Sequence, residues 1–160
     1  MAESCLDELK KNYEKLKLKY KLPGYVEINE DFDIEKLQEN ETDTLLREIR
    51  KVMMDKVIAY LRFIEGLLNP TNAPLFFFGL LKNLEANEKK LFEETYSKLG
   101  KIEIEVIEID NIYYESKEAE FIIKLFKEWQ GVKKDMSKIS KILEDGWKKK
   151  TGKKDRGYLG

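Results

Sequence analysis

Apolar residues recur at helical spacing along most of the chain. Near the N-terminus they fall at alternating steps of three and four residues, and Ser4, a residue type that commonly caps helices, stands just before them. Their positions are Leu6, Leu9, Tyr13, Leu16 and Tyr20. The sequence Leu-Pro-Gly at 22–24 follows. Because proline removes a backbone donor and glycine opens a turn, we predict that a first helix ends there.

Two longer apolar stripes predict two long helices. One runs to Leu68, where the sequence NPTNAP must break it, and the other extends from a cap at Ser116 to Trp147. Shorter helices are expected near 34–39, over 73–82 and over 85–99, the last with Gly100 as its C-terminal stop. The chain is therefore expected to fold as an all-α bundle of four to five helices, two of them long.

The sequence KIEIEVIEID at 101–110 fits two secondary structures. On a helix its isoleucines would scatter around the axis, whereas on a strand Ile102, Ile104 and Val106 share one face with glutamates opposite. Because these residues are also β-branched, we favour a strand over 101–109, paired with 25–29 in a minor two-strand patch. The alternative is a helix that continues to the next element.

A single helical domain is expected over 1–147. From Lys148 the sequence is KKKTGKKDRGYLG, which holds glycines and charges and has little to bury. Such a composition predicts a basic, disordered C-terminal tail over 148–160.

The apolar run LFFFGLL at 75–81 offers no polar face on a helix. We favour a buried plug enclosed by the two long helices. However, three adjacent phenylalanines cannot all point the same way, and a small bundle has limited means to cover Phe76, Phe77 and Phe78 together. A surface that contacts a partner protein is therefore the alternative, with these three side chains as candidate contacts.

The overall composition is ionic but balanced. The 160 residues contain 30 Lys+Arg and 31 Asp+Glu, a net charge of -1, so no global charge calls for nucleic acid or an anionic membrane. Abundant Lys and Glu with only two glutamines is typical of an intracellular protein from a thermophile. The first residues lack the apolar core of a signal peptide, and the longest apolar run is too short for a membrane helix. We expect a cytoplasmic protein without a membrane segment.

Several chemistries are excluded by residue type. Histidine is absent, so there is no Ser-His-Asp or Cys-His pair and no His-ligated metal, and Cys5 is the sole cysteine. No glycine-rich phosphate loop is present. Asn29, Asp31 and Asp33 have the spacing of a calcium loop, but Ile34 stands where such a loop needs glycine. We therefore expect no enzyme activity, cofactor or metal.

Charge is segregated along the chain. Residues 10–21 hold six lysines and one acid, 27–43 hold eight acids and one lysine, and 148–156 are strongly basic. An internal balance between the first helix and the acidic segment is the favoured interpretation. The alternative is contact with nucleic-acid phosphates by the first helix and the tail. The candidate contacts in the tail are Lys148, Lys149, Lys150, Lys153, Lys154 and Arg156.

Three hypotheses about function follow. The favoured one is a non-enzymatic module for protein–protein interaction or oligomerisation, binding a partner protein or itself through Phe76–Phe78 and one edge of 102–109. The second is an accessory nucleic-acid-associated protein. The third, an enzyme with a carboxylate-only metal site, requires at least three inward-facing acids close together.

Overall fold

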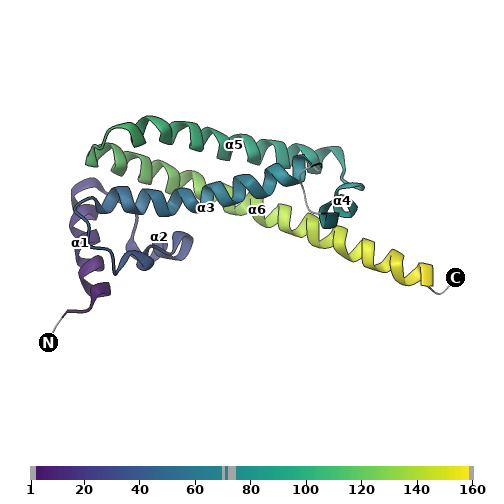
Figure 1. Cartoon of the computed structure of the whole chain (residues 1–160), viewed down its shortest axis with the longest axis horizontal. Helices are drawn as coiled ribbons and strands as arrows, with labels where there is room; N and C mark the ends of the chain where they lie inside the picture. Colours follow the sequence, from purple (N-terminus) through teal and green to yellow (C-terminus); the bar gives the residue numbers. More distant parts are fainter. Residues whose placement is uncertain (1–2, 70, 72–74, 159–160) are drawn as a thin grey trace. The chain divides into compact units, whose positions relative to one another are not determined.

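A computed structural model describes residues 3–69, 71 and 75–158 of the chain, and within them every regular element is helical (Figure 1). In order they are α1 (Cys5–Tyr20), α2 (Tyr25–Phe32), the 3₁₀ turn η1 (Ile34–Leu37), α3 (Leu45–Leu68), α4 (Leu75–Leu81), α5 (Ala86–Asn111) and α6 (Glu115–Tyr158). The predicted all-α bundle is confirmed. In the described ranges no helix is long and apolar enough to cross a membrane.

Two compact units divide the chain. Unit 1 comprises Met1–Ile58 and Ile102–Trp129, and unit 2 comprises Ala59–Lys101 and Gln130–Gly160. Because α3, α5 and α6 are long, each contributes residues to both units. The division into a domain over 1–147 and a tail over 148–160 stays a prediction, and the backbone of α6 is helical through Tyr158.

In unit 1, α1 begins and ends where the sequence predicts. The Ser4 hydroxyl accepts a hydrogen bond from the backbone N–H of Asp7 at 3.2 Å, and Lys21 closes the helix in the left-handed conformation. Cys5 at its first turn is exposed. Leu9 and Tyr13 are buried on the inner face, and the Tyr13 hydroxyl donates to the carbonyl of Pro23 at 2.6 Å.

The core of unit 1 is built from α2, η1 and the unit's parts of α3 and α6. Phe32 of α2 packs on Trp129 of α6 with ring centroids 5.0 Å apart, and the Lys56 amine of α3 donates to the backbone carbonyl of Asp31. The fully enclosed side chains around them include Ile28, Ile34, Ile49, Met53 and Ile122. α2 therefore contacts both α3 and α6 within this unit.

The core of unit 2 includes the short apolar helix α4. Leu80 is buried and approaches Gly146 of α6, where an added Cβ atom would lie 3.6 Å from the leucine side chain. Phe77 packs edge-on against Phe63 of α3 with centroids 5.7 Å apart. Fully buried residues that α5 and α6 contribute to this unit include Phe92, Thr95, Leu99 and Ile139.

The predicted two-strand patch is wrong. Residues 25–29 lie in α2 and residues 101–109 lie in α5, which runs without interruption through Gly100. A continuing helix satisfies each backbone N–H and C=O within the segment, whereas two short strands would leave their outer edges unpaired. The helix count also needs correction, because the described chain has six α-helices, three of which have 24 or more residues.

Candidate interaction surfaces

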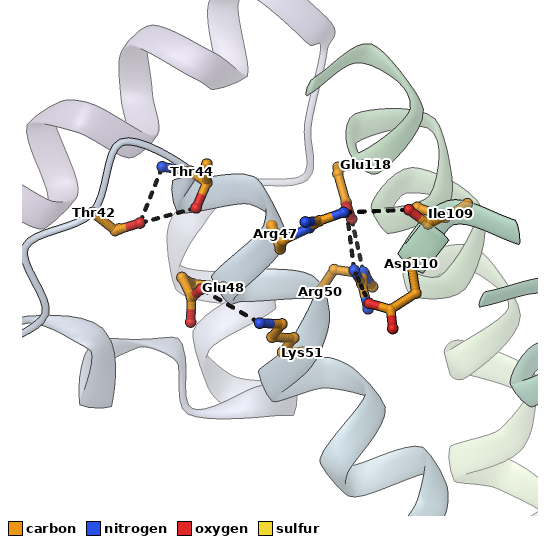
Figure 2. A network of polar contacts seen from close by, with 9 residues as sticks. All are labelled: Thr42, Thr44, Arg47, Glu48, Arg50, Lys51, Ile109, Asp110 and Glu118. Atoms are coloured by element: carbon orange, nitrogen blue, oxygen red, sulfur yellow. Dashed lines mark hydrogen bonds and ion pairs between the residues drawn. The ribbon is translucent and has the colours of Figure 1, made fainter. Parts of the chain in front are cut away.

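A buried ion network lies where α3, α5 and α6 meet in unit 1 (Figure 2). The Arg50 guanidinium donates to both oxygens of Glu118, from Nε at 2.8 Å and from NH2 at 3.1 Å. Arg47 Nε also donates to Glu118, at 3.2 Å, and Arg50 NH2 donates to Asp110 at 3.0 Å. The Glu118 side chain is 0% exposed and that of Arg50 is 4% exposed. The network thus pairs a buried carboxylate with two guanidinium groups.

The charges in this network are satisfied. Burial by itself lowers the pKa of Arg50, but the hydrogen bonds and charges of Glu118 and Asp110 outweigh it and raise that pKa above its ordinary value. Arg47 NH2 also reaches the backbone carbonyl of Ile109 at 3.5 Å. The arrangement holds no nucleophile, and its effect is to fix the end of α5 against α3 and the start of α6.

Two exposed isoleucines lie on the outer face of α5, in the turns that precede its contact with this network. Ile104 is 70% exposed and Ile107 is 60% exposed, whereas Ile102 on the opposite side is 2% exposed. The scatter expected for a helix over this segment is therefore observed. A water-facing helix usually presents polar residues on its outer face, so two large apolar side chains at a spacing of three residues form an atypical ridge.

A groove of about 500 Å³ lies beside the ridge, between the end of α5 and the start of α6. Ile109 and the buried Phe121 line it, and Ile112 and Tyr114 stand at its edge with 60% and 58% of their surfaces exposed. Its charged rim includes Glu105, Glu108, Lys117, Glu120 and Lys124. We call the ridge (Ile104, Ile107) together with this groove and its edge (Ile112, Tyr114) the α5–α6 surface. It lies wholly within unit 1.

The phenylalanines that were predicted to contact a partner differ in how exposed they are. Phe77 is half-buried against Phe63, Phe78 is 39% exposed, and the side chain of Phe76 lies outside the described part. The neighbouring Leu75 is 85% exposed, while Leu80 is buried. α4 is therefore both a plug and a partly exposed surface, and its role in binding a partner stays a prediction.

The structure places only part of the predicted nucleic-acid site. Lys148 and Lys149 are exposed on α6, and Lys148 Nζ lies 3.4 Å from Glu144. The side chains of Lys150, Lys153, Lys154 and Arg156 lie outside the described part. In α1, Lys11, Lys17 and Lys19 form ion pairs with Glu3, Glu14 and Glu115. Contact with nucleic acid stays a prediction.

No group of three or more acidic or cysteine side chains among the described residues is arranged to hold a metal ion.

In unit 2 a second groove, of about 730 Å³, lies between α3 and α6 and is lined by Tyr60, Phe63, Met136, Ile139 and Leu143. This groove was not predicted from the sequence, because the residues that line it belong to the apolar stripes of the long helices, which predict only that they are buried.

Comparison with known protein families, curated proteins and solved structures finds no significant match.

Sequence reasoning found part of the α5–α6 surface and missed the rest. The scatter of isoleucines at 102–109 indicated outward apolar residues, provided that the segment was helical. Ile112, Tyr114 and Phe121 were missed, because the groove forms only when the turn between α5 and α6 brings them together. The partners of Glu118 could not be identified from the sequence, because Arg50 and Arg47 lie 68 and 71 residues away.

Proposed function

We propose that this protein is a non-enzymatic helical module that binds another protein through the α5–α6 surface. The observation that supports this most strongly is the exposure of four large apolar side chains, each more than half exposed, within the eleven residues from Ile104 to Tyr114. Burying an isoleucine side chain contributes about 1.5–3 kcal/mol, so covering this surface supplies a substantial driving force for association.

The rigid base of the surface favours the same function. The Arg47, Arg50 and Glu118 network holds the end of α5 and the start of α6 in place before any partner arrives. A preorganised surface loses less conformational entropy on binding than a flexible one. The mixed rim, in which Lys124 donates to Glu105 at 2.9 Å, resembles the polar border around the apolar centre of protein interfaces.

Site-specific photocrosslinking tests the proposal. A photoreactive phenylalanine analogue is placed at Ile107, and in a matched control at Lys36, an exposed residue of η1 in the same unit. Irradiation of cells that make the full chain is expected to give a discrete protein adduct from position 107 and none from position 36. Mass spectrometry then identifies the adduct. Equal labelling at both positions, or none at 107, contradicts the proposal.

A further inference from the structure

The outer face of α1 is basic and carries one apolar residue. Lys11, Lys15 and Leu18 are spaced by four and three residues, so they share the face opposite to the buried Leu9 and Tyr13. Both lysines are exposed, and Leu18 is 82% exposed. This face therefore presents a large apolar side chain among positive charges.

The α5 side of the α5–α6 surface is acidic, and the two lysines on its α6 side, Lys117 and Lys124, pair with Glu120 and Glu105. Residues 103–110 contain four acids and no base, and these acids alternate with the exposed Ile104 and Ile107. Glu108 is exposed next to Ile107 and lines the groove, and the exposed Glu120 stands on its far side. An apolar ridge among acids is the electrostatic complement of an apolar residue among lysines.

Both faces belong to unit 1, and within one chain they do not cover each other. Leu18, Ile104 and Ile107 all remain exposed in that unit, although the C-terminal end of α1 is held by Glu115, which accepts from Lys19 at 3.2 Å and from Tyr20 at 2.6 Å. Two complementary faces that both remain exposed in one chain can pair between two chains. A two-fold axis would then form the contact twice.

We infer that two copies of this chain form a two-fold dimer in which α1 of each copy packs on the α5–α6 surface of the other. This inference rests on the proposed function and names the partner of that surface. Leu18 packs against Ile104 and Ile107 of the other copy, and Lys15 faces Glu108. The apolar contacts supply affinity, and the charges set orientation and the rate of encounter.

Sedimentation equilibrium of the purified full chain tests the dimer. At low ionic strength the mass is expected to be twice that of the chain. At about 0.5 M salt the dissociation constant is expected to rise, because charges near the surface are screened within a few ångströms. Ile107→Ala removes apolar contact at both symmetric interfaces, so it is expected to weaken the dimer at least about tenfold at either salt concentration.

Charge reversal tests the pairing of faces. Lys15→Glu and Glu108→Lys are each expected to weaken the dimer about tenfold or more, because each places like charges opposite one another. The combined variant reverses both partners and is expected to regain most of the affinity. Lys36→Glu, a reversal at an exposed lysine of η1, serves as the matched control and is expected to leave the constant unchanged. Circular dichroism of each variant verifies that helix content is retained.

The possible results separate this inference from the proposed function. A monomer under every condition, or a dimer that Lys15→Glu and Glu108→Lys leave intact, overturns the α1 pairing. In that event an adduct from position 107 with a different protein still supports the proposed function. A dimer that breaks with these reversals and regains affinity in the combined variant supports the inference, and photocrosslinking of the purified chain at 107 then gives a species of twice the chain mass.

Discussion

At the scale of single residues, Glu118 stands out as a carboxylate whose side chain is completely buried. Moving a carboxylate out of water is costly unless hydrogen bonds and opposite charges replace its hydration. Here two guanidinium groups surround it, and Arg50 binds both of its oxygens. The ion pair between Arg50 and Glu118 therefore adds little to the free energy of unfolding compared with an apolar pair of similar size. Removing one partner, however, leaves the other as a buried charge without compensation.

Glu118→Gln is expected to lower the free energy of unfolding by about 3–5 kcal/mol, because Arg50 then remains buried with only Asp110 as an anionic partner. Urea denaturation followed by circular dichroism measures the change. Glu128→Gln is the matched control at an exposed glutamate of the same helix, and it is expected to stay within about 0.5 kcal/mol of the parent. A loss no larger than that of the control would contradict the importance assigned to the network.

Glu115 links stability to pH. The hydrogen bond from the Tyr20 hydroxyl lowers the pKa of Glu115 below its ordinary value of 4.5; partial burial opposes this shift, and Lys19 reinforces it. A carboxyl whose pKa is lowered on folding stabilises the protein above its unfolded pKa, and this contribution is lost as the pH falls through the folded pKa.

Tyr20→Phe is therefore expected to lower the melting temperature near neutral pH and to have a smaller effect in acid, once the pH lies below the lowered pKa of Glu115 and this carboxyl is protonated in both states. Thermal unfolding across this range gives the two differences. Tyr114→Phe removes a hydroxyl from an exposed side chain and is expected to change neither. An effect of Tyr20→Phe that does not vary with pH would show that the hydroxyl acts only through packing.

At the scale of whole elements, sequence pattern predicted the helices that have a clear apolar stripe and a cap. α1 starts after Ser4 as expected, and the long stripes to Leu68 and through Trp147 lie in α3 and α6. α2 was missed, because its residues 25–29 were assigned to a short strand. Its stability comes from burial of Ile28 and Phe32, which only the tertiary structure shows.

The error at 101–109 has a related cause. β-branched residues favour strands by an amount that spans only about 1 kcal/mol across residue types, and local packing easily overrides it. A helix already formed over 86–100 extends at no cost of nucleation, and Ile102 is buried when it does so. Gly100 was expected to end the preceding helix but lies inside it, which costs about 1 kcal/mol relative to alanine.

Gly100→Ala is accordingly expected to stabilise the protein by about 0.5–1 kcal/mol, since an added Cβ atom at this position meets nothing within 4 Å. Gly100→Val is expected to stabilise it less, because a β-branched side chain loses rotamer freedom in a helix. Urea denaturation of both variants gives the order. If valine stabilised more than alanine, the backbone at this point would prefer an extended conformation and the continuous α5 would be in doubt.

At the scale of the molecule, the near-zero net charge conceals strongly charged segments. With 30 basic and 31 acidic residues, two copies experience little long-range repulsion, so local complementarity can decide whether and how they meet. The sequence revealed this segregation, but it suggested that the lysines of 10–21 balance the acids of 27–43. In the structure Lys19 pairs with Glu115 of α6, whereas Lys15 lines a groove that Glu39, Glu41 and Asp43 also line. Which charges face one another depends on contacts between residues far apart in the chain.

The continuation of α5 through an alternating sequence has a consequence for how the protein aggregates when it unfolds. The sequence KIEIEVIEID alternates apolar and acidic residues as a β-strand does. If this end of α5 unfolds, the segment can therefore stack with the same segment of other chains. Near neutral pH, the alternating carboxylates repel one another and oppose such stacks. In acid this repulsion disappears, so the same isoleucines that lie exposed in the native fold favour fibril formation once the helix opens.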